Sequence, residues 1–167
     1  QNGQFTPVCP EDLSRGDFIG VPQSIPSNGF DSLEAEYRPS EAYNAVELSL
    51  QDTWNPDLAR LLGYIVAEGY VEQRENNTGY VSITNNDEEI LNDAAQTLST
   101  LGLNHTVRDP HEGKDAKELM CSSGEFVSFL ANCDSQLLTG SETQRVPPAI
   151  LRASTEIKTA FLKAYIE

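Results

Sequence analysis

Hydrophobic residues recur at helical spacing in three parts of the chain. Asn55 is a favoured N-cap and Pro56 fits the first turn, so a helix is predicted from there to a C-cap at Gly69. A second helix is predicted over Asp87 to Leu101, and its acidic first turn suits the helix dipole. A third opens near Ser154. Its apolar positions are Ile157, Ala160, Phe161, Ala164 and Tyr165.

Apolar and polar residues alternate in the segments between these helices. Tyr70 to Arg74 and Tyr80 to Thr84 read as a hairpin with one apolar and one polar face. A second pair of strands is predicted over Asn104 to Arg108 and Lys117 to Cys121. A short helix over Gly124 to Asn132 follows. The order of elements predicts an α+β fold.

The chain before Asn55 has weaker patterning. Residues 1–26 carry turn signals and one short apolar run, Phe18 to Val21, which reads as the edge of a larger β structure. Residues 27–54 read as a polar connector with one strand over Ala45 to Leu50. No apolar stretch is long enough for a transmembrane helix, so no membrane partner is expected.

The acidic composition bears on the choice of partner. The 26 acidic residues exceed the 11 basic ones, and the net charge is −15. Taken alone, this charge argues against nucleic acid, because such binders are usually basic. In molar salt the screening length falls to about 3 Å, and only local contacts then count. A halophilic source and an ordinary acidic protein both fit the composition.

Several common site types are missing from the sequence. The three cysteines form no CxxC pair, which argues against a zinc site or a disulfide framework. No Ser-His-Asp or Cys-His arrangement and no Gly-rich phosphate loop is legible. His105 has only His111 as a histidine companion, so it is a poor candidate for a metal ligand or general base.

The first helix has a partial repeat near the C-terminus. Leu61 to Gly69 aligns with Leu162 to Glu167 at an offset of 162 − 61 = 101 residues, so that Gly63 matches Ala164. Small side chains at Gly63 and Ala67 would let two such helices pack closely. Their ends would then bring carboxylates together, and paired carboxylates with phosphate oxygens bind Mg²⁺. This arrangement suits phosphodiester cleavage.

With this repeat, the sequence resembles the LAGLIDADG homing endonucleases, specifically the intein-encoded (DOD) type. Leu61 to Gly69 matches the family motif position by position, and Leu162 to Glu167 matches the first six positions of a second motif. Arg145 to Leu151 resembles the segment before that second motif. Glu11 to Pro22 resembles the part of an intein splicing (Hint) domain that precedes the endonuclease.

The resemblance implies an αββαββα-type unit and a division of the chain into four parts. Residues 1–26 would end the first part of the splicing domain, 27–54 would connect, 55–152 would form the first endonuclease repeat, and 153–167 would begin the second. The polar strand faces would form a saddle over double-stranded DNA, with Mg²⁺ as cofactor. The parent protein would lie in the cytoplasm of a halophilic archaeon, between the exteins of a host.

The resemblance also implies residue roles. Glu68 would be the catalytic acid and Mg²⁺ ligand, and Lys117 a lysine near the cleavage centre. Gly63, Ala67 and Ala164 would form the helix interface. DNA contacts are expected from Arg74, Tyr80, Ser82, His105 and Arg108.

Two departures from the family pattern limit these expectations. The chain stops before position 169, where the second acid is expected, and position 1 is not a splicing nucleophile. This piece is therefore expected neither to splice nor to cut without the missing C-terminal half. Two alternatives stay open. One is a LAGLIDADG fold that binds DNA without cutting or acts as an RNA maturase, and the other is a decayed intein remnant.

Overall fold

The structure, a computed structural model, describes residues 9–16, 29–33, 36–39, 45, 47–109, 115–140 and 143–166. The strand expected at Phe18 to Val21, most of the expected splicing-domain edge, and His111 lie outside these ranges. None of the helices in the described ranges is long and apolar enough to cross a membrane.

Within the described ranges, five α-helices and four strands follow one another. The helices are α1 (Pro56–Glu68), α2 (Glu88–Thr100), α3 (Gly124–Cys133), α4 (Pro148–Arg152) and α5 (Thr155–Ile166). The strands are β1 (Gly69–Arg74), β2 (Thr78–Asn85), β3 (Thr106–Arg108) and β4 (Lys117–Ser122). Short 3-10 turns occupy η1 (Pro10–Asp12), η2 (Glu75–Asn77) and η3 (Ser135–Leu138). The predicted α+β order is confirmed, and the segment before α5 adds the unexpected helix α4.

Helix α1 begins and ends as its sequence predicts. The Asn55 side chain accepts a hydrogen bond from the Leu58 amide at 2.9 Å, which caps the first turn. Gly69 caps the other end in an extended conformation (φ −94°, ψ 162°), and the chain continues directly into β1. Glycine is required there because a Cβ would lie 2.5 Å from the Ile65 carbonyl oxygen. The helix therefore stops where the strand begins.

The strands form one antiparallel sheet in the order β1-β2-β4-β3. Gly69 lies opposite Ile83, and Ile83 lies opposite Leu119, so the ends of three strands meet beside the end of α1. Side chains alternate between the two faces of a sheet. The buried residues Val71, Val81, Ile83, Leu119 and Cys121 point to one face. The polar residues between them point to the other.

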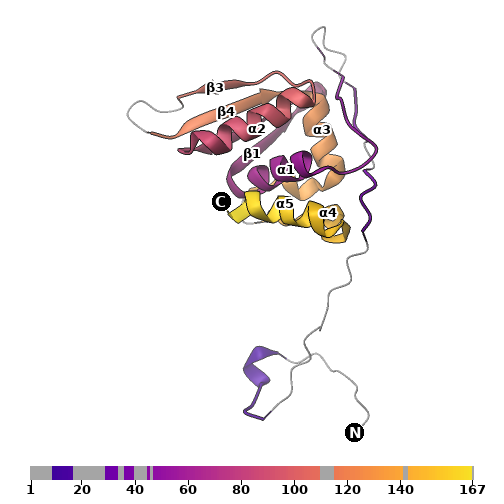
Figure 1. The fold of residues 1–167 in the computed structure, drawn as a ribbon, viewed down its shortest axis with the longest axis vertical. Coiled ribbons are helices and arrows are strands. Elements are labelled where there is room, and N and C mark those ends of the chain that lie inside the picture. The colour runs from indigo at the N-terminus through magenta and orange to yellow at the C-terminus, as the bar shows by residue number, and fades with distance from the viewer. Residues whose placement is uncertain are drawn as a thin grey trace.

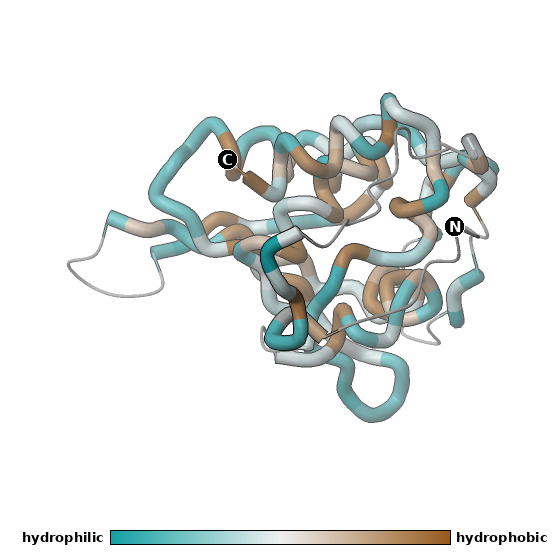
Figure 2. Tube along the Cα trace, turned by 90° about the horizontal axis from the view of Figure 1, so that it is seen from below, coloured by the Kyte–Doolittle hydropathy of each residue, from teal (hydrophilic) through white to brown (hydrophobic). Residues whose placement is uncertain are grey.

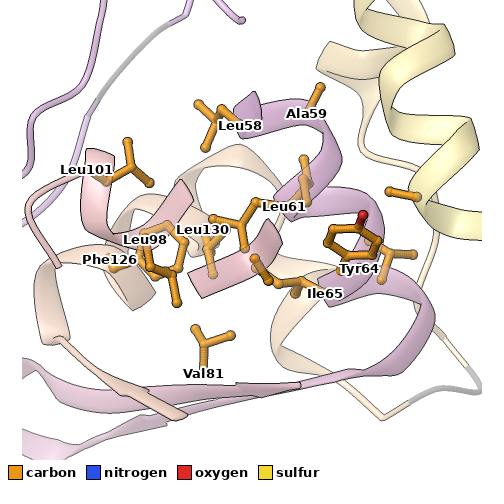
Figure 3. Close-up of a cluster of buried hydrophobic side chains, with 14 of the residues drawn as sticks. Leu58, Ala59, Leu61, Tyr64, Ile65, Val81, Leu98, Leu101, Phe126 and Leu130 are labelled. Carbon is orange, nitrogen blue, oxygen red and sulfur yellow. The ribbon is translucent and has the colours of Figure 1, made fainter. Parts of the chain in front are cut away.

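The helices cover only one face of this sheet. Figure 1 shows α1, α2 and α3 against the sheet and α5 on the far side of α1. The core between helices and sheet contains Leu61 and Ile65 from α1, Leu98 from α2, Phe126 from α3 and Val81 from β2 (Figure 3). The other face, which no described helix covers, is called the open sheet face below. Its described side chains are Tyr70, Glu72, Arg74, Thr78, Tyr80, Ser82, Thr84, Thr106, Arg108, Glu118, Met120 and Ser122.

The connector before α1 belongs to the core. Leu33, Leu48 and Trp54 are buried, and Leu33 and Trp54 are tied by backbone hydrogen bonds across the bridge between Ser32 and Thr53. The strand predicted over residues 45–50 is wrong for the described part of that range. The Ser49 amide instead donates to the Leu101 carbonyl oxygen after α2. The connector, although mostly polar, therefore contributes these three apolar side chains to the core.

An ion pair joins α1 to α2. Arg60 donates from Nε and Nη2 to the two carboxylate oxygens of Asp93 at 2.9 and 2.8 Å, and the Tyr64 hydroxyl donates to Oδ2 at 3.0 Å. These donors, Arg60 first, hold the pKa of Asp93 below its ordinary value. The pair therefore stabilises the fold only while Asp93 is ionised.

We expect Asp93→Asn to lower the free energy of unfolding by about 1 kcal/mol at pH 7, because solvent screens this partly exposed pair. The folded pKa is depressed, so this stabilisation is present above the unfolded pKa of about 3.9 and is lost as the pH falls through the lower folded value. Urea unfolding of both proteins between pH 7 and pH 3 measures the difference. Asp57→Asn, at the more exposed second partner of Arg60, is the matched control with a smaller expected loss. An equal loss in both variants at every pH would contradict the assignment.

Candidate functional site

The C-terminal ends of α1 and α5 meet at the proposed repeat. A Cβ added to Gly63 would lie 2.6 Å from the Phe161 carbonyl oxygen and 2.8 Å from the Ala164 Cβ. Gly63 and Ala164 occupy equivalent positions in the two copies of the repeat. When equivalent positions touch, the two helices are related by an approximate two-fold axis near the contact. Ala67, expected in the same interface, is instead exposed.

The last turn of α5 is apolar on its outer side. Tyr165 stacks on Phe161 with ring centroids 6.1 Å apart, and Ile166 is exposed. Figure 2 shows the brown of hydrophobic residues at this end of the chain, beside the C-terminus.

Glu68 lies at the mouth of a hollow where these helices end. The hollow has a volume of about 350 Å³ and is lined by Val66, Ala67, Glu68, Gln144, Arg145, Val146 and Tyr165. A carboxylate in the last turn of a helix faces the negative end of the dipole, and α1 has no basic residue there to offset it. Residues that break a local rule of this kind often serve function. The same negative potential favours a bound cation.

Arg145 is the basic residue that the structure brings to this hollow. Its Nε and Nη2 donate to the Asp134 carboxylate at 2.8 and 3.2 Å. The Asp134 side chain is only 3% exposed and also caps η3 through the Gln136 amide. Arg145 lowers the pKa of Asp134, so the carboxylate stays ionised and holds the guanidinium in place. A fixed positive group therefore shares the hollow with Glu68.

Sequence reasoning misses Arg145 because its position depends on a tertiary contact. The sequence marks Arg145 only as part of the linking segment, far along the chain from Glu68. A useful signal is present nonetheless. Asp134 is placed directly before a turn that its side chain caps, but the sequence does not indicate which cation pairs with it.

Lys117 lies at the same end of the sheet as Glu68, but its side chain pairs with α2. Lys117 pairs with Asn85 in the register and shares the helix-covered face with Leu119 and Cys121. Its ammonium forms an ion pair with Glu88 at the start of α2. Glu88 raises the pKa of Lys117, which keeps the ammonium charged. The structure does not bring Lys117 to Glu68, and its catalytic role stays a prediction.

The residues predicted to contact DNA fall into three groups. Arg74, Tyr80 and Arg108 lie on the open sheet face, and both arginines are exposed. Ser82 shares that face but is only 6% exposed, since Tyr70 and Met120 lie directly opposite it on the neighbouring strands.

His105 precedes β3 and forms the third group. It lines a separate hollow of about 270 Å³ with Glu125 and Met120, among others. Its Nδ1 is buried and has no hydrogen-bond partner among the described residues. His105 thus borders the open sheet face, because Thr106, Met120 and Ser122 of that face line the same hollow.

Both open-face arginines are paired with carboxylates. Arg74 forms an ion pair with Glu72 and lies over the Tyr80 ring, with Cζ 5.1 Å from the centroid. Arg108 Nε donates to Glu118 Oε2 at 2.6 Å. From the sequence, Glu72 is a candidate DNA contact on the polar face of its strand, whereas Glu118 is not assigned such a role. Alternation along β1 places Glu72 beside Arg74, and the register of β3 with β4 places Glu118 opposite Arg108.

The comparisons with known proteins agree with this architecture. Residues 55–134 match the family model described as a LAGLIDADG-like domain. The chain is 29% identical over 167 residues to a protein of the A-type ATP synthase of Pyrococcus abyssi, a match that covers 99% of this chain and 15% of that protein. It is 25% identical over 181 residues to the DNA-directed RNA polymerase protein Rpo1C of Methanocaldococcus jannaschii, covering 100% of this chain and 20% of that protein.

The chain thus spans a fifth or less of the length of these two relatives. A crystal structure of I-DmoI in complex with DNA and Mn has a TM-score of 0.43 and 19% identity, over 66% of this chain and 59% of that one. The segment that the family model matches runs from the start of α1 to the end of α3. Residues 55–134 are therefore similar in sequence to LAGLIDADG-like domains.

Proposed function

We propose that this chain is part of a site-specific endonuclease that hydrolyses phosphodiester bonds of double-stranded DNA with Mg²⁺. One observation carries the proposal: Glu68 ends α1 where α1 packs on its own repeat, beside Arg145 and next to an open polar sheet face. The repeat assigns the counterpart of Glu68 to position 169. The proposed enzyme takes its second carboxylate from that position, so that each half cuts one strand.

The open sheet face is suited to the major groove. Four strands at about 4.8 Å spacing span about 14 Å, close to the groove width of about 12 Å. Arg74 and Arg108 sit on the outer strands of the sheet, where they can reach phosphates or guanine edges. Tyr80 lies on β2, between the edges. DNA seated on this face runs past the end of the sheet that carries Glu68.

The residues at the hollow fit a magnesium ion. Mg²⁺ is usually held by one or two carboxylates together with substrate phosphates and water. Glu68 is an exposed carboxylate, and the described residues include no cluster of three acidic, His or Cys side chains that would form an all-protein cage. When bound, the ion activates water and stabilises the leaving oxygen. Glu68 holds and orients it.

Arg145 supplies an oriented hydrogen-bond donor to the proposed site. Its Nε and Nη2 donate to buried Asp134, which orients the guanidinium, although its side chain remains 60% exposed. A guanidinium has five N–H donors, so Arg145 can share itself between Asp134 and a phosphate oxygen, at the cost of repulsion between that phosphate and Asp134. We assign it to a phosphate oxygen close to the broken bond, where negative charge grows in the transition state.

The similarity to these relatives supports the proposal that the chain is part of an element inserted into a host protein. The same chain aligns along its whole length with segments of two proteins, one from an ATP synthase and one from an RNA polymerase, whose functions have nothing in common. A segment shared by unrelated hosts fits an intein with an endonuclease inside it. We propose that the parent protein lies between exteins in the same way.

The net charge of −15 supports activity at high salt. At molar salt the long-range repulsion from DNA is screened, and local contacts on the open sheet face decide binding. We therefore propose a halophilic source for the parent protein.

The test uses a plasmid that carries the host reading frame with the insertion removed. We expect the intact protein to convert the supercoiled plasmid to nicked and linear forms in Mg²⁺ at molar KCl, and to leave it uncut in EDTA. A gel shift without cutting would support the DNA-binding module instead. If the protein neither binds nor cuts the plasmid at any salt concentration, the proposed function is overturned.

We expect Arg145→Gln to lower the cleavage rate by about 100-fold and to change DNA affinity little, because the arginine acts on charge that develops in the transition state. Single-turnover cleavage and fluorescence anisotropy separate the two effects. Arg152→Gln, the same charge change at an exposed position of α4, is the matched control. Thermal melts of both variants check that unpaired Asp134 has not unfolded the domain. Equal cleavage rates for both variants would remove Arg145 from the site.

A further inference from the structure

The charges on the open sheet face cancel. Its charged side chains are two arginines, Arg74 and Arg108, and two glutamates, Glu72 and Glu118. Each arginine forms an ion pair with one glutamate of the same face. The face proposed to meet DNA therefore has no net charge among its described residues.

Both pairs are built into the sheet. Arg108 and Glu118 lie directly opposite each other on β3 and β4, and Glu118 is only 12% exposed. Glu72 and Arg74 are two residues apart on β1, so their side chains point the same way. Tyr80 lies opposite Glu72 and under the Arg74 guanidinium, and it also helps to lower the pKa of Glu72.

Such pairing changes what the arginines can do with DNA. An arginine bound to a carboxylate must leave it, or share it, before it can bind a phosphate oxygen, and the carboxylate itself repels the phosphate. Any duplex offers phosphates, so this penalty falls on every sequence alike. Hydrogen bonds to base edges offset this penalty only at a sequence whose donors and acceptors match the arginine and the glutamate. A glutamate can accept a hydrogen bond from the cytosine amino group while the arginine binds guanine.

We propose that Glu72 and Glu118 are specificity-determining residues that mask Arg74 and Arg108 and so suppress binding to non-target DNA. This inference rests on the proposed function for its partner, double-stranded DNA. It assigns the two carboxylates an active part in selection. In a protein of net charge −15, they set the local balance that remains when salt screens the rest.

The experiment measures binding to random-sequence duplex DNA by fluorescence anisotropy from about 0.1 M KCl upward. We expect the intact protein with Glu72→Gln and Glu118→Gln to bind about tenfold more tightly than wild type. The plot of log affinity against log salt should steepen by about 1 to 2, because each freed arginine adds a phosphate contact worth about 0.9 in slope. Glutamine keeps the shape and one acceptor oxygen.

Two further variants keep the interpretation specific. Glu89→Gln with Glu156→Gln makes the same change in net charge on exposed helix positions, and we expect affinity within about twofold of wild type. Adding Arg74→Gln and Arg108→Gln to the open-face double variant should remove the gain. If the control double gains as much, or the arginine-free variant keeps the gain, masking is overturned. If the open-face double fails to fold, Glu72→Gln alone, on the outer strand β1, must still bind more tightly.

This readout is independent of cutting. A gain in the open-face double variant without cleavage of any plasmid would leave the masking in place and overturn the endonuclease. Cleavage of the plasmid with no gain in affinity in the open-face double variant would support the endonuclease and overturn masking. No binding by any variant would overturn masking directly.

Discussion

Glu68→Gln is expected to abolish Mg²⁺-dependent cutting of at least one DNA strand, with a loss of about 1000-fold or more in rate. Glutamine has almost the same shape, but it lacks the negative charge that holds a hard cation against phosphate oxygens. The change removes the group on which water activation depends. The Glu68→Gln variant and the wild type, each as the full-length protein, are compared on a nicked plasmid and on a supercoiled plasmid. The two substrates together give the cleavage rate on each strand.

Binding provides the internal control for that variant. Glu68 lies at the mouth of the hollow and not on the open sheet face, so affinity for the target duplex in EDTA should not fall. Glu156→Gln, in the first turn of α5 at the opposite end of the helix pair, should cut as wild type does. A Glu68→Gln variant that cuts both strands at the wild-type rate would remove Glu68 from the site.

Gly63→Val is expected to lower the free energy of unfolding by about 3 kcal/mol, the upper part of the range for overpacked sites. The obstacle is backbone: a Cβ at Gly63 meets the Phe161 carbonyl oxygen at 2.6 Å, and a carbonyl oxygen in a helix cannot turn aside. Helices α1 and α5 would have to move apart. Urea unfolding at constant KCl measures the loss as a shift of the midpoint at constant slope.

Ala67→Val is the matched control, four residues further along the same helix. Ala67 is exposed, so the change should stay within about 1 kcal/mol, mostly the lower helix propensity of valine. Gly63→Ala should fall between the two, because the better helix propensity of alanine offsets part of the clash. If Gly63→Val and Ala67→Val are equally stable, α1 and α5 do not pack at Gly63.

The two variants separate chemistry from architecture. The Glu68→Gln variant is expected to stop cutting DNA but to remain as stable as wild type. The Gly63→Val variant is expected to be less stable, and the ends of α1 and α5 would no longer pack together at the hollow. The link between them is the short distance from the interface to Glu68, less than two turns of the same helix.

Two of the many acidic residues of this chain lie beside the arginines of the open sheet face. The chain has many more carboxylates than basic groups, yet the arginines that reach the open sheet face are placed beside glutamates. Alternation along β1 and the register of β3 with β4 thus distinguish Glu72 and Glu118 from the other acidic residues. The charge count could not single them out.

The local elements of this protein follow from its sequence. The Asn55 cap, the apolar stripe of α1, the acidic start of α2 and the alternation in β1 and β2 each depend on neighbours within a turn or a strand. The motif repeat also placed Gly63 and Ala164 at equivalent positions, and the structure brings them together. These features need no knowledge of distant contacts, because spacing and capping chemistry suffice.

Tertiary structure decided what lies beside what. Leu33, Leu48 and Trp54 join the core from a segment with no readable period, because burying them removes apolar surface from water. Lys117 turned to Glu88, since strand alternation placed it on the helix-covered face, and Arg145 reached the hollow of Glu68 because buried Asp134 holds it there. Sequence spacing determines which face a side chain shares within one element. Only packing between elements determines which charges meet, and here those meetings set the proposed catalytic site and the balance of charge on the open sheet face.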